Sequence, residues 1–283
     1  MAGNTPKAKA IGTQLRVARG KRSQRDVATQ LGWNHLKIHR AETGERPLEP
    51  DDLGDLIVAL GAPLDIATKL MSMASSDDDR GWFASGRTEQ QRQADALLGL
   101  EAVATRIVTV SPLLVPGPLQ HPAYTRSILR RAGVPEVEIA RRVAERQGRG
   151  PASFQRREDP AELIAFVDAG VFKRTLGDHE LLDLQLDLLL VLSELPTVTI
   201  RAIPFNAEWT AELEGPFSVL YGPDSTVIHR EDRLAGLFLH DPDQVKVYTD
   251  TLPQLEEVAM SPAATARLIA ESKSPGAKEE TTT

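Results

Sequence analysis

The sequence predicts two parts of different fold class: an all-α N-terminal domain of about five helices, and a C-terminal α+β domain with a small sheet and several helices. Between residues 11 and 74, apolar residues recur at helical spacing. Beyond about residue 105, short β-branched and aromatic runs alternate with longer amphipathic stretches. The predicted boundaries are a disordered tail at 1–10, the helical domain at 11–75, a linker region at 76–88, the α+β domain at 89–272, and a disordered tail at 273–283.

Start and stop residues delimit the N-terminal helices. Ile11, Leu15 and Ala18 share one face of a first helix, which Gly20 ends. Ser and Asn are favoured N-caps, and Gly is favoured just after a helix. We therefore expect a second helix from Ser23 to Gly32, a third at 35–42 capped by Asn34, a fourth at 53–60, and a fifth from about Pro63 to Ala74.

The C-terminal part alternates helical and extended patterns. The segment 107–110 fits either a strand or a continuation of the preceding helix at 89–104. We expect helices from Pro122, at 137–147, at 178–195, near 242–259 and near 262–271. We expect strands at 163–167, 198–203, 217–221 and 226–229.

Composition narrows the class of protein. The chain has no cysteine, which excludes disulfides and thiolate metal sites and fits a cytosolic protein. It has no run of 18 apolar residues, so no membrane partner is expected. The polar N-terminus lacks the apolar segment of a signal peptide.

The charge is divided unevenly along the chain. The net charge is −7, yet residues 1–50 carry ten Lys/Arg and four acids, a balance of +6. Residues 51–283 carry 23 basic and 36 acidic groups, or −13. A basic segment on an acidic body suggests that only the first fifty residues meet a polyanion, although a solvated basic tail would look the same.

Residues 15–44 have the order of elements of a helix-turn-helix. A tight turn at Gly32-Trp33 joins helices two and three. Trp33 is expected in the small core with Val27, Ala28, Leu31, Ile38 and Ala41. The polar residues left on helix three are those of a helix that reads base edges in a major groove: Asn34, His35, Lys37, His39 and Arg40.

This segment resembles the phage Cro and repressor class of helix-turn-helix, the XRE-like regulators. Gln24, Ala28, Glu42 and Gly44 match positions typical of that class. The resemblance implies that Gln24 contacts phosphate at the N-terminus of helix two, where backbone N–H groups also favour an anion. The residues expected to bind DNA are Gln24, Arg25, Asn34, His35, Leu36, Lys37, His39 and Arg40.

The rest of the chain resembles an actinobacterial subgroup of regulators, described as antitoxin-like or WhiJ-like, whose second domain has no known function. The matching stretches are 115–124, 142–147, 166–168, 185–186 and 261–262, and the resemblance covers about residues 11–272. His121 stands where that group has Thr, which weakens the expected cap before Pro122. The resemblance implies a small protein partner encoded nearby.

Other chemistry has weaker support. His35 and His39 have the spacing of a zinc pair, but no third ligand is evident, so we expect no metal and no cofactor. The second domain has scattered His and acidic residues (His121, Asp168, His179, Asp183, His229, Glu231, His240) but no catalytic motif, so we expect no enzyme. Asp178 and Glu180 more simply cap a helix. An arginine cluster at 141–157 is interpreted as a solvated helix face paired with local acids, with contact to DNA or an acidic partner left open.

Together these features predict a cytoplasmic, nucleoid-associated regulator that binds double-stranded DNA as a homodimer. An antitoxin-like adaptor that holds a small protein, and a repressor that senses a small molecule, remain alternatives. Binding should weaken steeply with salt. It should strengthen as the pH falls from about 8 to 6, because phosphate favours charged His35 and His39.

Overall fold

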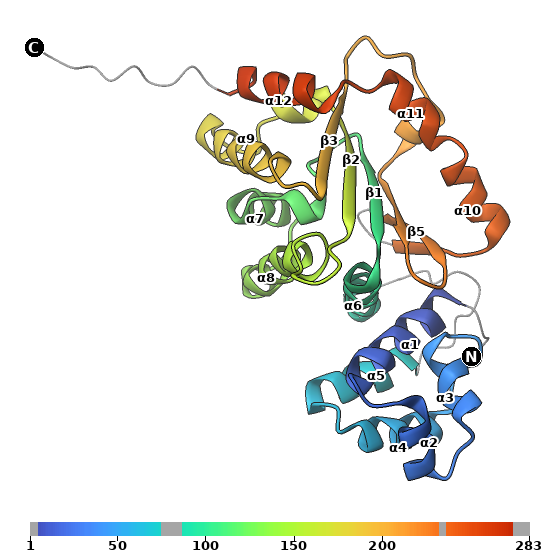
Figure 1. The fold of residues 1–283 in the computed structure, drawn as a ribbon. Coiled ribbons are helices and arrows are strands. Elements are labelled where there is room, and N and C mark those ends of the chain that lie inside the picture. The colour runs from blue at the N-terminus through green and yellow to red at the C-terminus, as the bar shows by residue number, and fades with distance from the viewer. Residues whose placement is uncertain (1–4, 75–86, 232–235, 274–283) are drawn as a thin grey trace, which may run out of the picture. The chain divides into compact units, whose positions relative to one another are not determined.

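The computed structural model describes residues 5–74, 87–231 and 236–273, and these form two compact units. The first consists of residues 1–104 and 220–245, and the second of residues 105–219 and 246–283. Helices dominate the N-terminal region, and a mixed α/β region follows it (Figure 1), so the predicted fold class is confirmed.

The N-terminal region contains the five helices expected from its apolar pattern. They are α1 (Pro6–Arg19), α2 (Gln24–Leu31), α3 (His35–Glu42), α4 (Pro50–Leu60) and α5 (Leu64–Ala74). The Ser23 hydroxyl accepts a hydrogen bond from the Asp26 N–H at 3.1 Å, and Asn34 Oδ1 accepts one from the Leu36 N–H at 2.9 Å. Gly32 adopts the left-handed conformation, and the Trp33 N–H returns to the Ala28 carbonyl at 2.8 Å.

The first helix starts earlier than the sequence predicts. Residues 6–10 were expected to be disordered, but α1 begins at Pro6, and Thr5 Oγ1 accepts the Ala8 N–H at 3.1 Å. Lys7, Ala8 and Ala10 are buried. Two lysines among these residues interrupt the apolar pattern, so the pattern becomes visible only at Ile11.

Three predicted segments lie partly or largely outside the described residues. The linker region at 76–88 falls there except for its last two residues, which open α6 (Arg87–Val103). Residues 1–4 and 274–283, from the two predicted tails, lie there too.

Close packing between α1 and α3 sets the geometry of the helical region. A Cβ added to Gly12 would lie 2.4 Å from the Glu42 carbonyl oxygen, so only glycine allows this approach. Val27, Ala28, Ile38 and Ala41 form the buried core, as expected. Leu31 and Trp33, which were expected there, are only partly buried. The Lys37 ammonium covers the Trp33 ring at 3.8 Å from its centroid.

The second region is built on a sheet with strand order β3-β2-β1-β4-β5-β6. Its strands are β1 (Arg106–Ser111), β2 (Glu162–Asp168), β3 (Val198–Ile203), β4 (Phe217–Tyr221), β5 (Thr226–Glu231) and β6 (Gly236–Leu239). β1, β2 and β3 are parallel, and β5 and β6 are antiparallel. β2 is buried at five successive positions, which is typical of a parallel strand covered on both faces.

Helices connect and cover the parallel strands. The β1–β2 connection contains η1 (Gly117–Leu119), α7 (Pro122–Arg131) and α8 (Glu136–Ala152). The β2–β3 connection contains η2 (Ala169–Lys173) and α9 (His179–Ser193). Figure 1 shows α7, α8 and α9 on the same side of the three parallel strands. The remaining elements are η3 (Ala211–Glu214), α10 (Pro242–Thr249), α11 (Leu252–Val258) and α12 (Pro262–Glu271).

Several expectations for this region are corrected or resolved. The segment 107–110 is a strand, not a helix continuation. The single helix expected at 242–259 is two helices, because the chain turns at Asp250-Thr251 and a proline opens the next helix. The four-residue strand β6 was missed, since so short a run has no clear period. His121 does cap α7: its Nδ1 accepts the Ala123 N–H at 3.2 Å.

Candidate nucleic-acid interface

Helix α3 presents one exposed polar face. Ile38, Ala41 and Glu42 point inward and are buried, with exposures of 0, 3 and 5 %. Their burial turns the opposite side of the helix toward solvent. That exposed side consists of Asn34, His35, Leu36, His39 and Arg40. Five of the eight residues expected to bind DNA therefore share one surface.

Asn34 and Lys37 are partly committed to other contacts. The Asn34 side-chain oxygen caps α3, which leaves its amide NH₂ to face outward. The Lys37 ammonium pairs with Asp52 Oδ1 of α4 at 2.7 Å while it covers Trp33. Lys37 therefore links α3 to α4 in this structure, and it lies to one side of the exposed face.

The two residues at the start of α2 that were expected to bind DNA also differ in how exposed they are. Arg25 is exposed. Gln24 is partly buried, and its Nε2 donates a hydrogen bond to Glu42 Oε2 at 2.7 Å. The Gln24 amide thus holds the N-terminus of α2 against the end of α3.

Glu42 is the centre of this arrangement. Its carboxylate accepts hydrogen bonds from Arg19 Nε at 2.5 Å and Arg19 Nη2 at 3.0 Å, in addition to the one from Gln24. The side chain of Glu42 is 3 % exposed and that of Arg19 is 14 % exposed. The hydrogen bond to Glu42 raises the pKa of Arg19. One carboxylate therefore ties together the end of α1, the start of α2 and the end of α3.

Gly44, two residues after Glu42, packs against the backbone of α1. Its φ is +75°, and a Cβ on it would lie 2.7 Å from the Lys9 nitrogen and 2.8 Å from the Lys9 Cα. The Glu-x-Gly pair at 42 and 44 is thus explained by packing. Glu42 supplies the ion pair, and Gly44 lets the chain pass the first turns of α1.

Many of the basic residues in the first fifty are engaged within the protein. Lys7 is buried, and Arg19 pairs with Glu42. Arg22 donates to the Ala59 carbonyl at 2.8 Å and to Gln30 Oε1 at 2.6 Å. Arg16 pairs with Asp224 at 3.4 Å. The surplus of positive charge that the sequence shows is therefore smaller at the surface.

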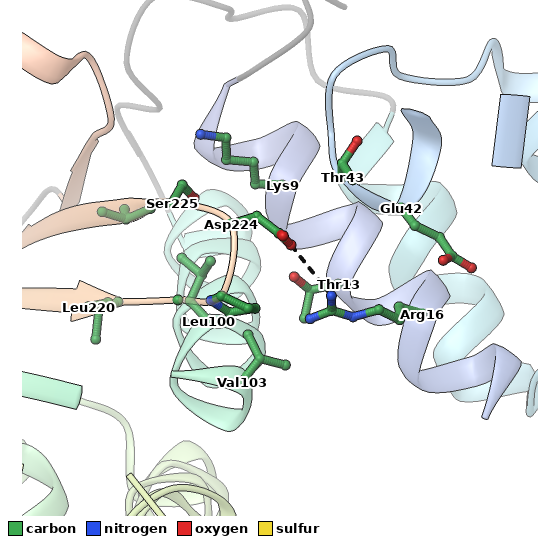
Figure 2. A pocket seen from close by; sticks show the side chains of 13 residues that line it. Lys9, Thr13, Arg16, Glu42, Thr43, Leu100, Val103, Leu220, Asp224 and Ser225 are labelled. Atoms are coloured by element: carbon green, nitrogen blue, oxygen red, sulfur yellow. Dashed lines mark hydrogen bonds and ion pairs between the residues drawn. The ribbon is translucent and has the colours of Figure 1, made fainter. Parts of the chain in front are cut away.

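Lys9 and Arg16 line a pocket within the first unit (Figure 2). Its other walls come from the end of α3, from Leu100 and Val103 of α6, and from the turn between β4 and β5. Figure 2 shows Arg16 reaching Asp224 across it. Burial lowers the pKa of Lys9, and the negative charge of Asp224 partly opposes that effect.

Sequence reasoning did not include two exposed cations. Lys21 lies in the turn between α1 and α2, and Arg46 lies just after α3. Neither side chain has a hydrogen-bond or ion-pair partner among the described residues. Each lies within two residues of a glycine that follows a helix, Gly20 or Gly44, and this position was the available signal.

Two arginines of α8 pair with local acids, as expected, while Arg146 donates to Gln120 Oε1 at 3.0 Å. Arg142 pairs with Glu138 at 3.2 Å, and Arg141 pairs with Glu145. Asp178 caps α9, as expected, by accepting the Leu181 N–H at 2.9 Å. Among the described helices, none is long and apolar enough to cross a bilayer. No group of three His, Asp or Glu residues suited to a metal occurs in the described part of the chain.

Comparison with known protein families assigns both regions. Residues 94–271, well over half of the chain, match a family described as a domain of unknown function, DUF5753. The chain belongs to the DUF5753 family. In this DUF5753 protein, residues 10–68 also match a helix-turn-helix domain, which implies DNA binding. No curated protein and no solved structure gives a significant match.

Proposed function

We propose that this DUF5753 protein is a sequence-specific transcriptional regulator that reads the major groove with α3. The supporting observation is that one side of α3 is packed against the protein and the other is exposed. Its inner residues are held by the core and by the Glu42 contacts. Its outer residues are exposed to solvent and have side chains that can contact base edges. A helix fixed on one side and polar on the other suits insertion into a groove.

The exposed side chains suit different parts of DNA. Arg40 can donate two hydrogen bonds to guanine, and the Asn34 amide and His39 can donate to base acceptors. Leu36, which is 45 % exposed, suits the methyl group of thymine. Arg25, Lys21 and Arg46 are the proposed phosphate contacts, with the backbone N–H groups at the start of α2.

In vitro selection of bound DNA with the full-length protein tests the proposal. We expect enrichment of a short motif repeated as two half-sites about one DNA turn apart, because regulators of this type bind as symmetric dimers. A selection that enriches no motif would contradict sequence-specific binding. A single unrepeated motif would be consistent with sequence-specific binding but would contradict binding as a dimer.

Arg40→Ala tests the reading role of α3. We expect a loss of about 1–3 kcal/mol on the selected site and little change on random DNA, because a base contact carries the specificity. Arg157→Ala is the matched control, since Arg157 is an exposed arginine far along the chain in the second unit. Competition binding assays would measure both variants. An equal loss on random DNA would make Arg40 a phosphate contact instead.

A second candidate role, for the DUF5753 domain, is protein binding through α9. Leu184 and Val191 of α9 are 45 % and 62 % exposed, and Leu181 and Leu188 on the same face are partly exposed. This spacing is that of a helix seam. It favours use of the domain in dimerisation or in holding a partner, as an antitoxin-like adaptor would.

Light scattering on the full-length protein tests this seam for dimerisation. If α9 joins two copies, Val191→Asp should lower the molar mass from dimer to monomer. Val247→Asp, at a position 66 % exposed on α10, should leave the mass unchanged. A dimer that survives Val191→Asp would assign the seam to another partner or to none.

A further inference from the structure

Glu212 is a buried acid in the second unit. The residue is 5 % exposed, and neither carboxylate oxygen has a hydrogen-bond partner within the described chain. The hydroxyl of Thr210, two residues earlier, is also buried without one. Burying a carboxylate without a compensating contact is costly, so such groups in folded proteins call for an explanation.

Glu212 belongs to a segment that contacts β1, an inner strand of the sheet. Glu212 lies in η3, within the connection 204–216 that leads from β3 to β4, and η3 contacts β1. The chain passes from β1 to β2 to β3 in one direction, and β4 then lies on the other side of β1. Ligands in sheets of this kind bind beyond the carboxyl ends of the strands, at the point where the order reverses.

Interactions between the strand ends show that they lie together. A Cβ on Gly170, just after β2, would lie 3.4 Å from the ring of Phe205, just after β3. Arg174 Nη1, following the same η2 turn, donates to the Leu113 carbonyl beyond β1 at 3.0 Å. In Figure 1 the orange connection that follows β3 leaves this end of the sheet.

Large apolar side chains are exposed in the segments that follow β1 and β3. Leu113, after β1, is 55 % exposed, and Phe205 and Trp209, after β3, are 67 % and 66 % exposed. Exposed apolar surface of this kind often marks a binding site.

The charge of the connection points to the class of ligand. Residues 204–216 contain three acids, Glu208, Glu212 and Glu214, and no lysine or arginine. Two cations, Lys173 and Arg174, lie at the end of η2. Lys173 Nζ lies 5.9 Å from the centre of the Phe205 ring, at the outer limit of a cation–π contact. Arg174 is held by the Leu113 carbonyl.

We propose that this edge of the DUF5753 domain binds a ligand that carries an alkylammonium group. The ammonium donates hydrogen bonds to the Glu212 carboxylate and the Thr210 hydroxyl, which satisfies both buried groups. Phe205 and Trp209 cover the apolar part of the ligand. Because the Glu212 oxygens are covered in the structure, the four residues of η3 must shift to admit it.

A thermal-shift assay with n-hexylammonium chloride tests the proposal on the full-length protein. We expect n-hexylammonium to raise the melting temperature in a saturable way. Hexanol and hexanoate at the same ionic strength should not, because they share the chain but lack the cation. Glu212→Gln should abolish the shift. Glu214→Gln should keep it, since Glu214 is an exposed acid in the same turn.

The two glutamate variants also test, without any ligand, whether Glu212 is a costly buried carboxylate. Removing an unpartnered buried charge should raise the melting temperature of Glu212→Gln above that of Glu214→Gln. A lower or equal melting temperature would overturn the proposal, as would a hexylammonium shift that survives Glu212→Gln or is absent altogether.

A capped Gly-Lys-Gly peptide distinguishes the two sources of an alkylammonium group. A shift with n-hexylammonium alone indicates a free small-molecule amine, and a shift with both indicates a lysine side chain of a protein. The assay does not involve DNA, so its failure leaves the proposed regulatory function untouched, and failure of DNA selection leaves this site untouched.

Discussion

At the scale of single residues, Glu42 is a motif residue that holds the helices of the candidate interface together and does not itself face solvent. Its carboxylate makes three hydrogen bonds to Arg19 and Gln24, from two other helices. The sequence placed Glu42 and Gln24 correctly within a helix-turn-helix pattern. It gave no signal that the two side chains meet, because contacts between residues 18 apart depend on how the helices cross.

Glu42→Ala should destabilise the helical region by about 2–4 kcal/mol, because it leaves the Arg19 guanidinium without its partner in a largely buried place. Faster amide hydrogen exchange throughout α1–α3 would report this loss. Glu45→Ala is the control: its pair with Arg40 spans 4.0 Å and both side chains are 51 % exposed, so it should cost less than about 1 kcal/mol. Equal effects of the two variants would contradict the role given to Glu42.

At the scale of elements, sequence patterns predicted helices well and short strands less well. The caps Ser23 and Asn34 and the terminator Gly32 mark α2 and α3 because these signals are local. The strand β6 and the break between α10 and α11 escaped, because they depend on pairing and packing. On α3, periodicity separated inner from outer residues. It could not show that Asp52 of α4 would hold Lys37.

Glycine substitutions test the packing between elements. Gly44→Ala should destabilise the protein by more than about 1 kcal/mol, because its positive φ and the 2.7 Å approach to the Lys9 backbone both exclude a Cβ. Gly54→Ala is the matched control within α4. A Cβ there meets no atom within 4 Å, so alanine should stabilise the helix by about 0.5–1 kcal/mol. Thermal unfolding measures both, and a neutral Gly44→Ala would contradict the close approach.

At the scale of the whole molecule, a net charge of −7 coexists with DNA binding because charge is distributed by region. The count of +6 for residues 1–50 overstates the positive surface, since Arg16, Arg19 and Arg22 are engaged within the protein. Sequence composition cannot reveal such pairing. The proposed ligand site of the DUF5753 domain could not be inferred from the sequence for another reason: Glu212 becomes unusual only once it is seen to be buried with no hydrogen-bond partner among the described residues.

The salt dependence of DNA binding measures how many cations reach phosphate. We expect the logarithm of affinity to fall linearly with the logarithm of salt concentration. Arg25→Ala should reduce the magnitude of that slope by about 1, because it removes one phosphate contact. Arg16→Ala should leave the slope nearly unchanged, since Arg16 pairs with Asp224. A flat salt response of the unaltered protein would refute the electrostatic basis of binding.

The early start of α1 has a practical consequence for work with this protein. Thr5, Lys7 and Ala8 are buried, and the backbone around Ala8 and Lys9 touches Gly44 beside the end of α3. The sequence pattern would suggest a truncated chain that starts at residue 11. Such a truncation would remove the first turn of α1, against which Gly44 packs. Shortened forms for DNA-binding measurements should therefore keep the residues from Thr5 onward.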